Sequence, residues 1–170
     1  MAFLWTRRCL AVATLFGAIL SGITIDRYFV QRPAFEHLGA VAWGAYSRVA
    51  DLGPNGLVLY PLIGIGYAVF TAAAAVSFGL SGGKPSKAAL PVYGGVLLVI
   101  GGLAATLEAA PTMIGVAKLG EDAILLQQSF DQFFFWSAIR GTLQVIAFLA
   151  NFWGLLSLYS TYAADIRQQL

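Results

Sequence analysis

The chain has 170 residues, of which 59% are hydrophobic and 11% are charged, and its formal net charge is +2 at pH 7. This balance is too apolar for an ordinary water-soluble domain and indicates an integral membrane protein. Because no run of Lys and Arg is interleaved with aromatic residues, the sequence gives no support for nucleic-acid binding.

The residue counts also limit the cofactors. The chain has one cysteine, Cys9, and one histidine, His37, so an internal disulfide, bis-histidine haem ligation and a multi-histidine metal site within this chain are excluded. These counts do not exclude a carboxylate-rich metal site. We predict no metal and no cofactor.

The first element is an apolar run that we expect to cross the membrane. Arg7 and Arg8 precede it, as basic residues precede the apolar core of a secretory signal peptide, but the run continues to Ile25 and the segment 20–22 is a poor small-x-small cleavage site. We therefore predict a membrane span at residues 9–27.

A polar connection follows at residues 26–55. It contains a proline after Arg32, a stretch compatible with a helix, and the turn signal GPN at 53–55. Its His37 is a candidate acid/base residue, because histidine has an unperturbed pKa near neutrality, and its Trp43 is a candidate ligand contact. The alternative is that His37 is a surface or capping residue.

Two further apolar runs predict spans at 56–80 and 88–110, joined as antiparallel neighbours by the turn SGGKPSK. Tyr60 lies on one side of the first of them with Gly64, Tyr67 and Thr71, so it is a candidate ligand contact. Small and hydroxyl residues equally form ordinary packing seams between membrane helices. A second connection, broken midway, is expected at 111–132.

The last predicted span, 133–162, carries polar residues within an apolar run. At 100° per residue, Trp136, Arg140, Gln144 and Asn151 fall on one narrow stripe and are candidate site residues. An arginine near the bilayer centre costs about 2.5–3.5 kcal/mol, so Arg140 should either turn into the bundle or reach the outer headgroups.

Glu108, near the outer end of the third span, is a candidate partner for Arg140, because charges within a membrane nearly always pair or face water. A Glu108–Arg140 ion pair could simply lock two spans together. Alternatively, Arg140 binds an anion or a carbonyl oxygen while Glu108 orients it or acts as a base. The candidate catalytic residues are therefore Arg140, Glu108 and His37.

Together these elements predict an all-α fold. Runs of this length match a hydrocarbon core about 30 Å thick, and they lack the alternation of barrel strands. We expect one domain, residues 1–170, that forms an integral membrane four-helix bundle with a helical extracytoplasmic connection between the first two spans. Basic residues at 7, 8, 84 and 87 favour cytoplasmic termini, in a bacterial inner membrane.

Two short motifs stand out in a chain of about 170 residues: Trp136-x-x-x-Arg140 opens the last predicted span, and Arg32-Pro33-Ala34 follows the first. In these motifs and in its length the chain resembles a family of small four-span membrane proteins that includes anthrone oxygenases of aromatic polyketide pathways. The resemblance implies oxygen insertion into an activated aromatic without a tightly held metal or flavin, at a site that includes Trp136 and Arg140. The segment LGPNGLVLY at 52–60 departs from that pattern.

Three functions are therefore open. The first is a small enzyme or binding protein that holds a hydrophobic, aromatic or quinone-like molecule near the outer face of the bundle. The second is a non-catalytic subunit that packs against partner membrane subunits, or against copies of itself, and binds lipid, quinone or pigment. The third is a small transporter that uses Arg140, Gln144 and Asn151 as a path. Membrane lipid is a partner in each case.

Overall fold

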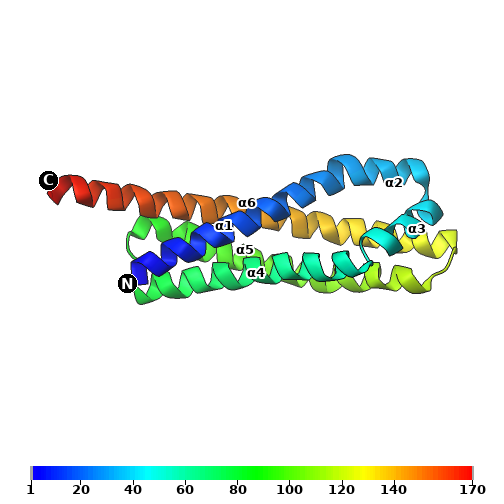
Figure 1. The fold of residues 1–170 in the computed structure, drawn as a ribbon, viewed down its shortest axis with the longest axis horizontal. Coiled ribbons are helices and arrows are strands. Elements are labelled where there is room, and N and C mark those ends of the chain that lie inside the picture. The colour runs from blue at the N-terminus through cyan, green and yellow to red at the C-terminus, as the bar shows by residue number, and fades with distance from the viewer. Residues whose placement is uncertain (1, 170) are drawn as a thin grey trace.

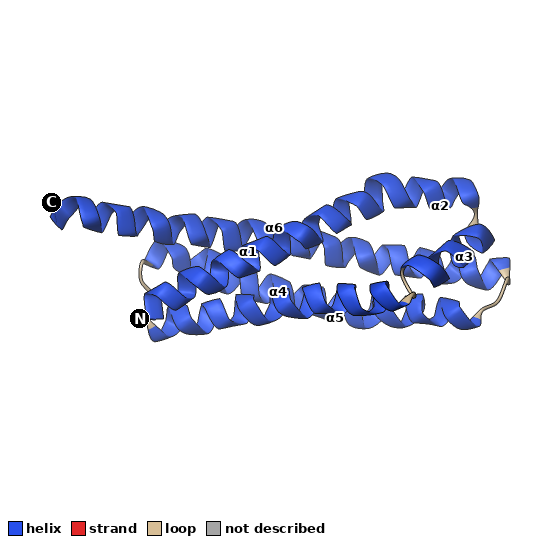
Figure 2. Ribbon diagram, in the orientation of Figure 1, coloured by secondary structure: helices blue, strands red, loops and turns tan. Residues whose placement is uncertain are grey.

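A computed structural model describes the backbone of residues 2–169 and the side chains of residues 4–160. The fold is all-α, as predicted, with four long helices packed lengthwise as a bundle (Figures 1 and 2). The helices are α1 (Ala2–Asp26), α2 (Arg32–Leu38), α3 (Ala40–Ala50), α4 (Pro54–Leu80), α5 (Ala89–Gly115) and α6 (Ala123–Gln169).

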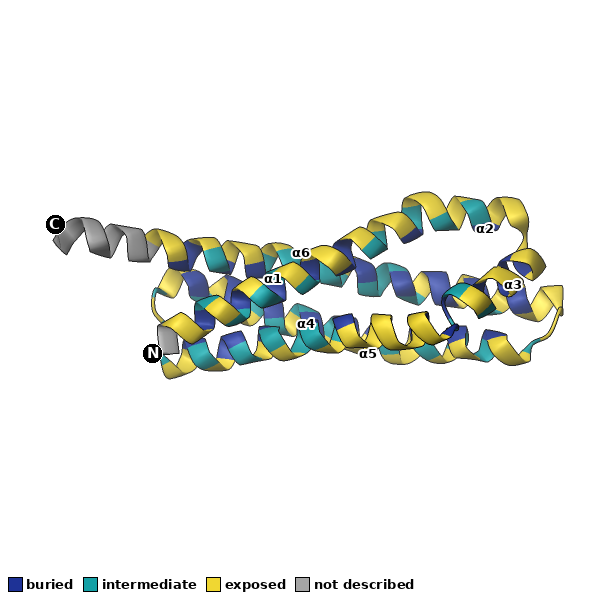
Figure 3. Ribbon diagram, viewed as in Figure 1, coloured by how far each residue is buried: buried dark blue, intermediate teal, exposed yellow. Residues whose placement is uncertain are grey.

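Four helical stretches are long and apolar enough to cross a membrane, and each overlaps one predicted span. Large apolar side chains point outward from them; Leu97 and Leu107, for example, expose 70% and 76% of their surface. Buried residues face the centre of the bundle (Figure 3). These features support an integral membrane protein, with the stretches Leu4–Leu38, Pro54–Leu80, Ser86–Lys118 and Ala123–Ser160 as candidate spans.

The connection between the first two spans is helical, as expected. From α1 the chain continues without a break through a π-helical turn, Arg27–Gln31, into α2. Pro33, in the first turn of α2, has no N–H to donate to the preceding helical turn, and the backbone there changes to π-helical geometry. Gly39 ends α2 with a φ of +80°, a conformation that favours glycine, and the chain turns back into α3.

The second connection is much shorter than the segment 111–132 that the sequence suggested. α5 continues through Pro111, and one 3₁₀ turn, Val116–Lys118, leads to α6. The Asp122 side chain caps α6 by accepting hydrogen bonds from two backbone N–H groups, at 3.0 and 3.1 Å. The prediction differed because Pro111 was treated as a breaker, whereas a membrane helix tolerates the loss of one backbone hydrogen bond.

An aromatic cluster closes the end of the bundle next to α3. The Phe35 ring centroid lies 5.4 Å from that of Phe130 and 5.3 Å from that of Phe134, which joins α2 to α6. Trp43 of α3 is buried in the same cluster. Arg48 of α3 donates hydrogen bonds to backbone carbonyls in the turn between α5 and α6. The first turns of α1 and the last turns of α6 lie at the opposite end (Figure 1).

Candidate functional site

A cavity of about 390 Å³ lies among the four long helices, in the half of the bundle next to α3. This volume is within the range of small-molecule sites. Every long helix contributes to its wall, together with the turn between α3 and α4. Most of the lining is apolar, so the few charged and polar side chains in it define its chemistry.

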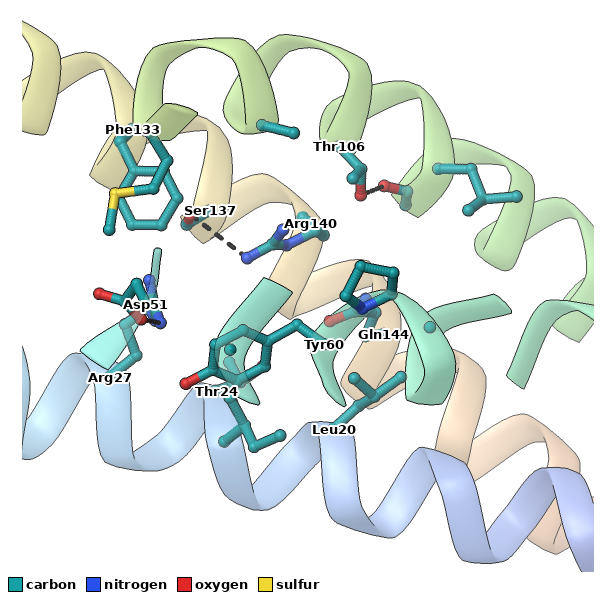
Figure 4. A pocket seen from close by; sticks show the side chains of 18 of the residues that line it. Leu20, Thr24, Arg27, Asp51, Tyr60, Thr106, Phe133, Ser137, Arg140 and Gln144 are labelled. Atoms are coloured by element: carbon teal, nitrogen blue, oxygen red, sulfur yellow. Dashed lines mark hydrogen bonds and ion pairs between the residues drawn. The ribbon is translucent and has the colours of Figure 1, made fainter. Parts of the chain in front are cut away.

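Arg140 projects from α6 into this cavity (Figure 4). Of the two arrangements that the sequence allowed, the structure has the inward one. Within the described part of the chain, its guanidinium makes one hydrogen bond, a long one of 3.5 Å to the Ser137 hydroxyl, and no carboxylate lies within ion-pairing distance. Most of its N–H donors therefore face the cavity.

A buried ion pair forms the end of the cavity closest to α3. Arg27 Nη2 lies 3.1 Å from Asp51 Oδ1, and the two side chains expose 8% and 9% of their surface. The Arg27 guanidinium also lies 5.0 Å from the centre of the Phe133 ring and 6.0 Å from that of Tyr60. Its Nε is buried and has no hydrogen-bond partner among the described residues.

The turn into α4 fixes the position of Asp51. Here the backbone passes so close to itself that a Cβ atom at Gly56 would lie 2.3 Å from the Asp51 carbonyl oxygen. Only glycine fits this approach without a shift of the backbone. The segment GPNG at 53–56 therefore both starts α4 and holds the carboxylate opposite Arg27.

The cavity has an excess of positive charge. Its charged lining residues are Arg27, Asp51 and Arg140, which give two positive charges and one negative charge, a net charge of +1 when all are ionised. Asp51 neutralises Arg27, so the uncompensated charge belongs to Arg140. Because a buried charge without a counter-ion costs several kcal/mol, the cavity favours an anion or a strongly polarised oxygen.

Two other predicted site residues line the same cavity. Gln144 lies one helical turn after Arg140, and within the described residues its side-chain amide makes no hydrogen bond. Tyr60 reaches the cavity from α4 (Figure 4). The structure therefore brings Arg140, Gln144 and Tyr60 together.

The predicted acid/base residues lie outside the cavity. The Glu108–Arg140 ion pair, which the sequence left open, is not formed. Glu108 is exposed on α5, and the ion pairs among the described residues are Arg27–Asp51 and Arg32–Glu36. The reason is helical geometry, because Ala109 lies on the buried face and Glu108 is rotated about 100° from it. His37 is exposed near the end of α2.

The remaining predicted residues have packing roles. Trp136 lies outside the cavity, with its ring centroid 5.3 Å from that of Phe135, and Trp43 belongs to the aromatic cluster. Asn151 is fully buried deeper in the bundle, where its Nδ2 donates to Thr71 Oγ1 at 3.0 Å and to the Tyr67 hydroxyl at 3.4 Å. Asn151 thus ties α6 to α4 and does not line the cavity.

Sequence reasoning missed the Arg27–Asp51 pair because Arg27 stood at the last position of the predicted span 9–27 and Asp51 in the polar connection 26–55, so neither was expected to be buried. A signal was available. Leu20, Ile23 and Arg27 follow one another at intervals of three and four residues, the spacing of one helix face, so Arg27 continues the buried face of α1.

The cavity opens sideways, between α4 and α5. Its large exposed lining side chains come from these two helices and from neither of the others: Leu57, Tyr60 and Ile65 of α4, and Leu103 and Ile114 of α5. Beyond the opening, a hollow of about 300 Å³ continues between the same helices and shares Val99 and Leu103 with the cavity. We call this second hollow the α4–α5 groove.

Comparison of the chain with protein-family models, with curated proteins and with solved structures found no match. The resemblance to the anthrone-oxygenase family therefore rests on its short motifs alone. Within the described residues, no three His, Cys, Asp or Glu side chains lie close enough together to hold a metal ion.

Proposed function

We propose that this protein binds an apolar small molecule inside the membrane, with a polar end of that molecule against Arg140. The observation that carries the proposal is the cavity of about 390 Å³ into which Arg140 projects without a carboxylate partner. A largely apolar wall with a few convergent polar groups is typical of small-molecule sites. The sideways opening supports uptake from the bilayer.

If the protein is an enzyme, the cavity supports one catalytic contribution, which comes from Arg140. Arg140 can stabilise negative charge that develops on a substrate oxygen, as in an oxyanion hole. Glu108 and His37 lie outside the cavity, so neither supports a proton-transfer step within it. Asp51 is the carboxylate in the lining, and it is held by Arg27. These positions favour binding over acid/base catalysis.

A variant that fills the cavity tests the proposal. Gly64 lines the cavity, and a Cβ atom added there meets nothing within 4 Å, so the side chain of Gly64→Leu should occupy the ligand space. Gly22→Leu is the matched control, because Gly22 is also a helical glycine with open space but lies exposed on α1, outside the cavity.

The measurement is mass spectrometry of lipophiles that co-purify with the protein, each compared with its abundance in the host membrane. We expect one or more lipophiles to be enriched on the wild-type protein and on Gly22→Leu, and to be lost from Gly64→Leu. Equal enrichment on all three proteins, or none on the wild type, would contradict the proposal.

A further inference from the structure

We propose that the ligand is a single-chain amphiphile with one small anionic head, of the fatty-acid type. Its head binds at Arg140, beside Arg27, and its chain lies in the α4–α5 groove. This inference rests on the proposed function and adds the charge, the size of the head and the shape of the ligand. Three features of the site carry it.

The first feature is the charge of the cavity. Arg27 and Asp51 neutralise each other, whereas Arg140 has a single long hydrogen bond to Ser137 in the described structure. A ligand with one negative charge therefore brings the cavity to neutrality.

The second feature is the groove that leads away from the cavity. Its wall consists of aliphatic side chains apart from Thr71, a residue that is 1% exposed and whose hydroxyl accepts a hydrogen bond from Asn151. From the level of Tyr60 to that of Ala72, α4 rises about 18 Å at 1.5 Å per residue. A long alkyl chain, parallel to the helices as in the surrounding lipid, matches this path.

The third feature is the closed end of the cavity next to α3. Arg27, Asp51, Met113 and Phe133 are all buried there, so the head cannot extend past them towards water. A phospholipid carries a glycerol, a second chain and usually a further group on its phosphate, and this closed end leaves no room for them. A carboxylate that ends the molecule suits the site better.

The test compares two probes with the same chain and different heads. Binding of radiolabelled palmitate and of radiolabelled hexadecanol is measured by scintillation proximity on the detergent-purified protein. A charge-assisted hydrogen bond contributes about 1.5–3 kcal/mol, so we expect palmitate to bind at least about tenfold more tightly than hexadecanol. Arg140→Gln should remove this preference, and Arg140→Lys should keep part of it.

Arg32→Gln is the control for charge removal, because Arg32 is exposed on α2 and lies outside the cavity. It should leave both affinities unchanged. If Arg140→Gln retains the full preference for palmitate, the inference is wrong. If palmitate and hexadecanol bind equally and Gly64→Leu blocks both, the anionic head is wrong while the proposed function stands. If neither probe binds and no lipophile co-purifies, both fail.

A second variant tests the groove and leaves Arg140 in place. Ala72 lines the groove and is exposed, so Ala72→Phe should obstruct the chain; Ala104→Phe, on an exposed position of α5 outside both hollows, is the control. We expect Ala72→Phe to weaken palmitate binding severalfold and to leave octanoate binding unchanged. Unchanged palmitate binding in Ala72→Phe, or co-purification of phospholipid and no fatty acid, would overturn the inference.

Discussion

Arg27 and Asp51 form an ion pair that is almost completely removed from solvent, whereas Arg32 and Glu36 form one on the surface of α2. The two pairs have similar N···O distances, 3.1 and 3.2 Å, so burial is the main difference between them. Breaking a buried pair leaves an uncompensated charge, at a cost of about 3–5 kcal/mol, but an exposed pair contributes about 0–1 kcal/mol.

We therefore predict that Asp51→Asn lowers the free energy of unfolding by about 3 kcal/mol or more, and that Glu36→Gln changes it by less than about 1 kcal/mol. Unfolding in detergent, followed by circular dichroism, measures both values. Equal effects of the two substitutions would show that Asp51 is not the counter-ion that keeps Arg27 in the bundle. The double variant Arg27→Met with Asp51→Leu should recover part of the loss.

For single residues of the site, helical periodicity in the sequence predicted some and missed others. Helical periodicity placed Arg140 and Gln144 on one face of the last span. Because exposing an arginine to lipid is costly, Arg140 was expected to turn into the bundle. Periodicity cannot tell which neighbour a charged side chain will meet. Glu108 lies one position away from the buried face of α5, and the true carboxylate of the site, Asp51, comes from a different segment of the chain.

Two adjacent glycines of α5 have different surroundings, and only Gly95 lies against α6. A Cβ atom at Gly95 would lie 2.8 Å from Asn151 Oδ1 of α6, whereas one at Gly94 meets nothing within 4 Å. Asn151 cannot easily move away, because it is fully buried and donates hydrogen bonds to α4. The close approach of the two helices therefore requires glycine at position 95.

This contrast gives a prediction with a built-in control. Gly95→Ala should destabilise the protein by about 1–3 kcal/mol, because the extra methyl group overpacks the contact with α6. Gly94→Ala should be neutral or stabilising by up to about 1 kcal/mol, since alanine is the better helix former. Unfolding in the same detergent measures both, and a similar destabilisation by both substitutions would contradict the proposed contact.

Which elements form could be predicted from the sequence, but not all of their ends. The lengths of the apolar runs fixed the number and type of the long helices, since each run was long enough to cross a bilayer. Pro111 was misleading, because neighbouring helices can compensate for one missing hydrogen bond within a membrane helix. Likewise, no local feature of the sequence predicted the π-helical turn at 27–31 or the packing of α3 against α6.

At the scale of the whole molecule, the two ends of the bundle differ in the contacts that their basic residues make. The end with the α4–α5 turn carries Lys84 and Lys87, together with the basic residues at 7 and 8 near the start of α1. At the other end, Arg27 and Arg32 are each paired with a carboxylate and Arg48 donates to backbone carbonyls, whereas Lys118 is exposed on the short turn between α5 and α6. We therefore expect the first end, which includes both termini of the chain, to lie in the cytoplasm.

Cysteine labelling tests this orientation. In a Cys9→Ser background, Ser86→Cys marks the α4–α5 turn and Ala117→Cys marks the turn between α5 and α6; both positions are exposed and neither substitution changes a charge. On intact bacterial cells with a permeable outer membrane, a membrane-impermeant maleimide should label the cysteine at 117 and spare the one at 86. Disrupting the inner membrane should expose both. Labelling of position 86 alone in intact cells would mean that the polar cavity lies in the cytoplasmic half of the bilayer and receives its ligand from the inner leaflet.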